Sequence, residues 1–214
     1  MKELKIKVCG MRDPENISGV VAAFPDYLGF IFYPKSKRFV GFEPSPEMYA
    51  KIPASIKKVG VFVDESPEKV LKISEKWNLD VVQLHGQETP GYCKQIRSSG
   101  ITVFKAFSVD EQFDFGILKT YSGECDFFLF DTKGQLPGGT GKKFNWQLLE
   151  SYKLNVPFFL SGGISSDDLN TIRELSHPQL FGIDINSGFE ISPAVKDIRK
   201  VKKFIAEIRR KKYK

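Results

Sequence analysis

The sequence predicts a single (β/α)8 barrel, an α/β fold in which eight strand and helix units close into one cylinder. Short β-rich runs alternate with helical patterns along the whole chain, and they recur about every 22 to 31 residues. There are eight such runs, which favours a closed parallel barrel over an open doubly wound sheet, since the latter usually has fewer strands. The predicted strands span residues 4–9, 27–32, 57–63, 80–85, 102–107, 126–131, 157–162 and 180–185.

Helix-start signals follow several of these strands. Asp13 and Ser66 each stand directly before a proline, the pairing of N-cap and first helical residue that begins many helices. Ser165 or Ser166, with Asp167, opens a later helix. The apolar residues that continue these patterns at helical spacing are Ile17, Val20, Val21 and Phe24, then Val70, Ile73 and Trp77, and lastly Leu169, Ile172 and Leu175.

Two segments depart from the regular pattern. Residues 109–122 contain Gly116 and few periodic apolar residues, so we expect the fifth helix to be short or missing. Residues 196–214 carry ten of the basic residues and two of the acidic ones, and the remaining 22 basic and 24 acidic residues nearly cancel. The apolar positions of the last segment recur at helical spacing at Val195, Ile198, Val201, Phe204, Ile205 and Ile208. This pattern predicts an amphipathic helix with a charged outer face.

Length, charge distribution and cysteine content bound the class of protein. The 214 residues fit one barrel domain spanning residues 1–214, and no run has the length and apolarity of a signal peptide or membrane span. The three cysteines are odd in number and lack metal-ligand spacing, so we expect reduced thiols and no metal site. We therefore expect a cytoplasmic protein without membrane or nucleic-acid partners, with a DNA binder that uses the basic tail as an alternative.

Four polar or reactive residues fall on the inward face of the predicted barrel near the strand ends. Side chains alternate between the two faces of a strand, so the outward apolar residues fix the inward ones. Those outward residues are Ile6 with Val8, Val82 with Leu84, Phe128 with Phe130, and Phe181 with Ile183 and Ile185. This phase directs Cys9, His85, Asp131 and Asp184 into the barrel at the end where such enzymes build their active sites. Each residue alone has an ordinary structural explanation, and the prediction depends on their convergence.

Two loops have the character of a phosphate site. The seventh strand ends in SGGI, where Gly162 and Gly163 let the backbone approach an anion just ahead of a helix start. Asn186 and Ser187 follow the eighth strand and supply polar donors at the matching position. The loops after strands seven and eight form the recurrent phosphate site of barrels, so we expect a phosphorylated small-molecule ligand.

Two further loops leave alternatives open. The sequence PGGTG at residues 137–141 follows Asp131 and could be a second anion site or a flexible lid, and the lid is favoured because the next helix begins only at Asn145. In the loop after the second strand, Arg38 has the planar fork that binds a carboxylate in two places. A solvated surface loop is the alternative for Arg38.

Eight blocks of sequence together resemble phosphoribosylanthranilate isomerase, in order and over nearly the whole chain. They are KVCGMRDPENI (7–17), GFIFYPKSKRFV (29–40), VGVFV (59–63), VQLHG (82–86), LFDT (129–132), GGTGKKFNW (138–146), LSGGI (160–164) and GIDINSGFE (182–190). The resemblance implies a cofactor-free (β/α)8 enzyme of tryptophan biosynthesis. Such an enzyme converts N-(5-phosphoribosyl)anthranilate to 1-(o-carboxyphenylamino)-1-deoxyribulose 5-phosphate by an Amadori rearrangement.

The same resemblance implies roles for the candidate residues. Cys9 corresponds to the general base that removes the C2 proton, and Asp131 to the general acid that opens the ribose ring. Arg38 resembles the residue that binds the anthranilate carboxylate, and the glycine loop and Asn186-Ser187 resemble the phosphate site. His85 and Asp184 resemble supporting residues near the ribose or the catalytic pair.

Lys7 lies on the same inward face as Cys9, about 6.6 Å along the strand. We hypothesise that its charge helps the Cys9 thiolate to form, and we expect the site to favour that thiolate.

Other functions fit the sequence less well. Related phosphosugar barrel enzymes, such as the isomerase of histidine biosynthesis and indoleglycerol-phosphate synthase, rely on other catalytic residues, so Cys9 with Asp131 argues against them. A non-catalytic sensor of phosphorylated ligands would need only the anion loops. The sequence leaves the oligomeric state open, with a monomer preferred over a homodimer.

Overall fold

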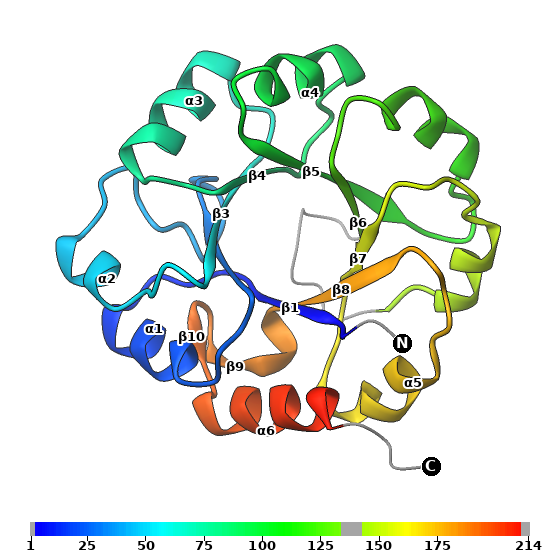
Figure 1. Cartoon of the computed structure of the whole chain (residues 1–214). Coiled ribbons are helices and arrows are strands. Elements are labelled where there is room, and N and C mark those ends of the chain that lie inside the picture. The colour runs from blue at the N-terminus through cyan, green and yellow to red at the C-terminus, as the bar shows by residue number, and fades with distance from the viewer. Residues whose placement is uncertain (1–2, 134–142, 211–214) are drawn as a thin grey trace.

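The computed structural model describes residues 3–133 and 143–210. Eight parallel strands form a closed barrel in the order β1 to β8, with β1 hydrogen-bonded to both β2 and β8 (Figure 1). The predicted (β/α)8 fold is therefore confirmed. The strands are β1 Lys5–Val8, β2 Tyr27–Ile31, β3 Lys57–Phe62, β4 Val81–Leu84, β5 Thr102–Val109, β6 Phe127–Thr132, β7 Phe158–Leu160 and β8 Leu180–Ile185.

Helices surround the barrel in a ring (Figure 1). The α-helices are α1 Pro14–Val21, α2 Pro46–Ala50, α3 Pro67–Lys76, α4 Pro90–Arg97, α5 Leu169–Glu174 and α6 Ile198–Arg209. Short 3₁₀ helices complete the ring: η1 Phe115–Tyr121, η2 Trp146–Ser151, η3 Ser166–Asp168 and η4 Ser187–Phe189. The fifth unit contains only η1, as the weak periodicity of residues 109–122 predicted. Within the described ranges, no helix combines the length and apolarity needed to cross a membrane.

The predicted helix starts are real caps. The side chain of Asp13 accepts a hydrogen bond from the Asn16 N–H and begins α1, and Ser66 does the same for Lys69 at α3. Ser165 begins η3, which leads directly into α5. These caps set where each loop ends and therefore how much chain is free at the barrel rim.

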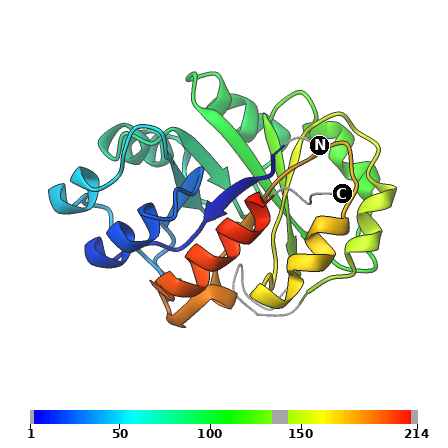
Figure 2. The same ribbon diagram turned by 60° about the horizontal axis from the view of Figure 1, so that its bottom comes forward.

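The last helix, α6, lies on the outside of the barrel between α1 and α5 (Figure 2). It buries Val201, Phe204 and Ile205, as an amphipathic helix does, and its basic residues Arg199, Lys202 and Lys203 are exposed. A small antiparallel hairpin, β9 Glu190–Ser192 with β10 Val195–Lys196, stands between β8 and α6.

Two apolar layers fill the molecule. The outer layer lies between the sheet and the helices and contains the outward residues of every strand, such as Val8 and Phe130. The inner layer fills the barrel and consists of Val59, Val81, Phe104, Ala106, Leu129 and Phe159, with Tyr27, Phe127 and Phe181 packed against it. Side chains therefore fill the barrel interior below the rim, and a pocket lies above them at the carboxyl ends of the strands.

Three predicted positions are wrong. Phe181 packs inward against the rings of Phe127 and Phe159, because the β7–β8 register shifts between Phe158 and Phe159 and places an extra residue in β8. Phe24 lies beyond the end of α1 with φ +54° and is 67% exposed, so it does not extend the apolar stripe. Val195 belongs to β10 rather than to the final helix.

Replacing Phe159 by alanine tests the inner layer. Phe159 is fully buried, and the centre of its ring lies 5.0 Å from that of Phe104 and 5.4 Å from that of Tyr27. We expect Phe159→Ala to lower the free energy of unfolding in urea by about 3–5 kcal/mol, because it leaves a cavity that its neighbours cannot fill. Phe24→Ala is the matched control and should change it by less than about 0.5 kcal/mol. Equal effects of the two substitutions would contradict a packed barrel interior.

Candidate active site

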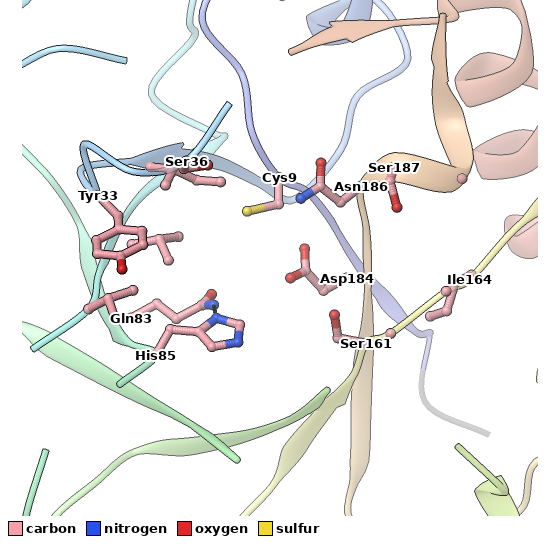
Figure 3. Close-up of a pocket in the computed structure, with 16 residues that line it drawn as sticks. Cys9, Tyr33, Ser36, Gln83, His85, Ser161, Ile164, Asp184, Asn186 and Ser187 are labelled. Atoms are coloured by element: carbon pink, nitrogen blue, oxygen red, sulfur yellow. Dashed lines mark hydrogen bonds between the residues drawn. The ribbon is translucent and has the colours of Figure 1, made fainter. Parts of the chain in front are cut away.

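A pocket opens at the carboxyl ends of the strands, and residues at or just after the ends of β1, β2, β3, β4, β7 and β8 line it (Figure 3). The lining residues are Cys9, Ile31, Tyr33, Ser36, Val61, Val63, Gln83, His85, Ser161, Gly162, Gly163, Ile164, Asp184, Asn186, Ser187 and Gly188. The pocket therefore lies at the rim predicted from the strand phases, and seven of its lining residues belong to the predicted site.

Cys9 follows the last residue of β1 and is held at the barrel rim by its backbone. Its N–H donates to the Ile185 carbonyl at 2.9 Å, and the residue is only 4% exposed. A Cβ on Gly29 of β2 would lie 2.7 Å from Cys9 Sγ and 3.2 Å from Lys7 Nζ. Glycine at that position thus leaves the space that the thiol and the ammonium share.

Lys7 and Asp184 form a buried ion pair beneath the thiol. The two residues are direct neighbours across the β1–β8 register, and Lys7 Nζ donates to Asp184 Oδ2 at 2.9 Å. Lys7 is fully buried and Asp184 is 5% exposed. Asp184 lines the pocket, and its Oδ1 is buried without a hydrogen-bond partner among the described residues.

The ionisation of Cys9 corrects one expectation. Burial raises the pKa of the Cys9 thiol and dominates, the Lys7 ammonium opposes it, and Asp184 adds to the rise. The expectation that the free site favours the thiolate is therefore wrong, because desolvation outweighs the nearby cation. The contribution of Lys7 has the hypothesised sign. Burial lowers the pKa of Lys7 itself, but Asp184 and Cys9 outweigh this, so Lys7 stays an ammonium.

Asp131 and His85 meet on the other side of the pocket. His85 Nε2 lies 3.2 Å from Asp131 Oδ2, and the Thr132 N–H donates to Asp131 Oδ1 at 3.0 Å. Gln83 Nε2 lies 2.9 Å from His85 Nδ1. When the Gln83 amide donates in this contact, the ring proton of His85 is on Nε2, which lies close to Asp131 but makes no hydrogen bond of regular geometry within the described residues. The strand phase placed Gln83 inward, but no sequence signal linked it to His85.

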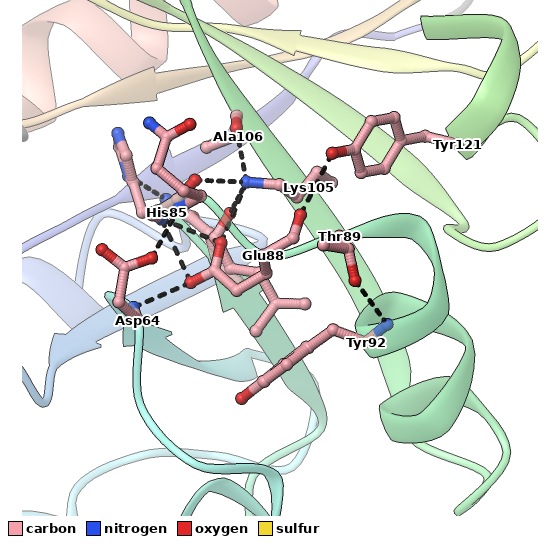
Figure 4. Close-up of polar contacts among 12 residues, drawn as sticks. Asp64, His85, Glu88, Thr89, Tyr92, Lys105, Ala106 and Tyr121 are labelled. Atoms are coloured by element: carbon pink, nitrogen blue, oxygen red, sulfur yellow. Dashed lines mark hydrogen bonds and ion pairs between the residues drawn. The ribbon is translucent and has the colours of Figure 1, made fainter.

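A buried network fixes the loop that follows His85 (Figure 4). The Glu88 carboxylate accepts hydrogen bonds from the Gly86 and Asp64 N–H groups and from Lys105 Nζ at 3.0 Å. Lys105 also donates to the carbonyls of Leu84, Gly86 and Ala106. Both charged side chains are nearly fully buried, so the backbone on either side of His85 is held on β5.

The loops after β7 and β8 lie against each other at the pocket. Gly162 has φ +88°, and a Cβ there would lie 2.2 Å from Thr132 Oγ1 and 2.4 Å from the Thr132 nitrogen. Gly163 has φ +65°, and a Cβ on Gly188 would lie 2.1 Å from the Ile164 carbonyl oxygen. This close approach requires glycine. The helix start after the glycines is the short 3₁₀ helix η3.

Arg38 is already paired. Its Nε and Nη2 contact the Glu190 carboxylate at 2.8 and 2.6 Å, and its side-chain stem passes beside Gly10. Arg38 and Asp131 are not among the residues that line the pocket, although Asp131 contacts His85, which does line it. The predicted lid at residues 137–141 lies outside the described residues.

Comparison with known proteins identifies the family. Residues 6–207 match the family model described as N-(5'phosphoribosyl)anthranilate (PRA) isomerase. The chain belongs to this family. Relatives named N-(5'-phosphoribosyl)anthranilate isomerase include one from Parabacteroides distasonis, 46% identical over 95% of this chain and 92% of the relative. Another, from Phocaeicola vulgatus, is 43% identical over 96% of this chain and 98% of the relative.

Solved structures of the family share the whole fold. The phosphoribosyl anthranilate isomerase of Thermotoga maritima superposes with a TM-score of 0.86 at 34% identity and covers 96% of this chain and 98% of that chain. The enzyme from Thermus thermophilus gives a TM-score of 0.84 at 26% identity, with the same coverage. The resemblance inferred from the eight sequence blocks is therefore confirmed as family membership.

Within this family framework, the Lys7 substitution tests the electrostatics beneath Cys9. We expect Lys7→Met to raise the Cys9 pKa further, because it removes the main effect that opposes burial. The thiolate absorbance, taken as the difference from a Cys9→Ser protein, would follow the titration. Lys5→Met is the matched control: Lys5 lies on the same strand but pairs with Asp26, and its side chain is 39% exposed. An unchanged Cys9 pKa in folded Lys7→Met would refute the assigned role of Lys7.

Proposed function

We propose that this protein catalyses the isomerisation of N-(5-phosphoribosyl)anthranilate to 1-(o-carboxyphenylamino)-1-deoxyribulose 5-phosphate, a step of tryptophan biosynthesis. The observation that carries the proposal is one pocket lined by a rim thiol, by a histidine that contacts the Asp131 carboxyl group, and by two glycine-containing loops, in a chain of this family. A phosphoribosyl anthranilate isomerase with 32% sequence identity has been crystallised with reduced 1-(o-carboxyphenylamino)-1-deoxyribulose 5-phosphate. The reaction is an aldose–ketose isomerisation.

Asp131 acts as the general acid in this proposal. Its proton goes to the ring oxygen of the ribose, the bond between that oxygen and C1 breaks, and the nitrogen lone pair forms an iminium at C1. The carboxylate left behind accepts from the Thr132 N–H and faces His85 Nε2. An Nε2–H held there by Gln83 stabilises the negative charge on Asp131 as it develops.

Cys9 acts as the general base on the opened substrate. Its thiolate removes the C2 proton, the electron pair moves into a C1–C2 double bond, and the iminium becomes a neutral enolamine. Protonation at C1 and loss of the hydroxyl proton at C2 then give the ketone. Burial raises the pKa of Cys9 in the free protein, so the thiolate needs a further stabilising charge once the substrate is bound. The positive charge of the neighbouring iminium supplies it and favours loss of the thiol proton.

Binding groups at the two ends orient the substrate between Cys9 and Asp131. The loop N–H groups around Gly162 and Gly163, with Asn186 and Ser187, hold the phosphate. Arg38 uses the edge of its guanidinium that Glu190 leaves open to bind the anthranilate carboxylate.

The remaining sequence predictions belong to this proposal. Residues 1–214 act as one domain, and the enzyme works as a monomer. A relative from Thermotoga maritima is described as a dimer from which monomers were generated, so the oligomeric state is a separate measurement by light scattering.

Turnover and two substitutions test the proposed chemistry. The purified protein should consume freshly generated N-(5-phosphoribosyl)anthranilate, as followed by loss of its fluorescence, without added metal or nucleotide. Cys9→Ala and Asp131→Asn should each lower kcat by about 10²- to 10⁴-fold, because each removes one proton-transfer group. Folded wild-type protein that shows no turnover above spontaneous decay would refute the proposed function.

The geometry of the phosphate loop yields a second test. We expect Gly162→Ala to raise KM by roughly tenfold while kcat changes less, because the added methyl group collides with Thr132 and the backbone has a positive φ. Gly123→Ala is the matched control, since nothing lies within 4 Å of a Cβ there. A Gly162→Ala protein with the wild-type KM would show that this loop does not bind the phosphate.

A further inference from the structure

Glu190 and Lys196 form a buried ion pair next to the pocket that the proposed chemistry does not use. They face each other across the β9–β10 hairpin, and Lys196 Nζ donates to Glu190 Oε1 at 2.7 Å. The Lys196 side chain is fully buried and that of Glu190 is 5% exposed. Burying two charged groups costs free energy, because both lose their hydration. A role in the structure or function of the site would explain why this pair is buried.

Glu190 fixes the direction of Arg38. Its two carboxylate oxygens accept from Arg38 Nε at 2.8 Å and from Nη2 at 2.6 Å, which is the bidentate geometry that holds a guanidinium in one plane. The Ala194 N–H also donates to Oε1 at 3.1 Å, which ties the carboxylate to the hairpin turn. Burial raises the pKa of Glu190, yet the bond from Arg38 and the charge of Lys196 outweigh it, so the group is ionised. The Nη1 edge of Arg38 takes no part in this pairing.

Lys196 fixes the direction of the Asn186 amide. Burial lowers the pKa of Lys196, and the Glu190 carboxylate 2.7 Å away opposes this effect. The Asn186 atom that accepts from Lys196 Nζ at 2.7 Å is the amide oxygen. The amide nitrogen then points away from Lys196, and in Figure 3 it lies on the side of Cys9. Asn186 therefore presents a donor to the pocket, as an anion requires.

The hairpin that carries the pair is itself anchored on the barrel. Asn16 of α1 is 7% exposed, and its side chain bonds both the N–H and the carbonyl of Lys196 at 2.8 and 2.9 Å. The Asp197 N–H donates to the Phe189 carbonyl at 2.8 Å. One rigid element thus contacts Arg38, from the loop after β2, and Asn186, from the end of β8.

We propose that Glu190 and Lys196 are positioning residues that hold Arg38 and Asn186 at a fixed separation, so that the pocket recognises a ligand by the distance between its carboxylate and its phosphate. This inference rests on the proposed function, because Arg38 and Asn186 bind the two ends of that substrate. Neither Glu190 nor Lys196 touches the reacting atoms. Their removal therefore affects KM more than kcat.

A double-mutant cycle tests whether Glu190 positions Arg38. In the wild-type background, Glu190→Gln keeps the shape of the side chain but loses the charge that clamps Arg38, so we expect KM to rise about 10- to 100-fold. In an Arg38→Met background, Glu190→Gln should raise KM much less than in the wild type, because the effect through Arg38 is gone and only the effect through Lys196 and Asn186 remains. Equal increases in the two backgrounds would overturn the positioning of Arg38, since they would reflect a general structural role.

Calorimetric binding of inorganic phosphate tests, without turnover, whether Lys196 orients the Asn186 amide. We expect Lys196→Met to weaken phosphate binding about tenfold, because the Asn186 amide loses the bond that orients it. Lys202→Met, which removes an exposed lysine from α6, is the matched control and should bind phosphate like the wild type. Lys196→Leu also removes the donor toward Asn186 and serves if Lys196→Met does not fold. Wild-type phosphate affinity in a folded Lys196 variant would overturn the orienting role of Lys196.

The outcomes separate this inference from the function on which it rests. Wild-type protein without turnover, or without phosphate binding, contradicts the proposed function directly. Normal wild-type turnover and phosphate binding, combined with unchanged KM in Glu190→Gln and unchanged phosphate affinity in Lys196→Met, contradict only the positioning role.

Discussion

Closure of the barrel between β1 and β8 is the constraint on which the site depends. The register places Lys7 beside Asp184 and Val8 beside Ile185. Cys9 and Asn186, which follow the last residues of β1 and β8, therefore leave the barrel next to each other. The buried ion pair between Lys7 and Asp184 lies on this seam, directly below the thiol. A shift of one residue would reverse the faces of β1, placing Lys7 among the apolar side chains of the outer layer and Cys9 away from the pocket.

Buried lysine–carboxylate pairs act throughout the rim as geometric devices. Lys7 with Asp184 supports the thiol, Lys105 with Glu88 holds the loop after His85, and Lys196 with Glu190 orients binding groups. Such pairs contribute little net stability, because desolvation of the charges offsets their attraction. Their hydrogen bonds to loop backbone and polar side chains instead give the loops one defined conformation. The scaffold below them is apolar and aromatic, and the pocket lies above it at the carboxyl ends of the strands.

The sequence predicted the parts of this architecture that depend on local pattern. Alternation along each strand placed Cys9, His85 and Asp131 inward, and proline after a capping residue located α1 and α3. It did not predict the inward turn of Phe181, because a bulge depends on how the neighbouring strand pairs. Nor did it predict the partner of Arg38, since Glu190 lies 152 positions away. One indication in the sequence was not interpreted: Lys105 stands among the outward apolar residues of β5, and in the structure it pairs with Glu88.

A crystal structure of this protein with reduced 1-(o-carboxyphenylamino)-1-deoxyribulose 5-phosphate tests the central claim most directly, namely that Cys9 and Asp131 act on a substrate held at both ends. The account predicts C2 of the ligand within about 4 Å of Cys9 Sγ, a distance suited to proton removal. It also predicts the phosphate at Gly162 and Asn186 and the carboxylate at the open edge of Arg38. A ligand bound in the reverse direction, or with C2 far from Cys9, would contradict the assignment of the base.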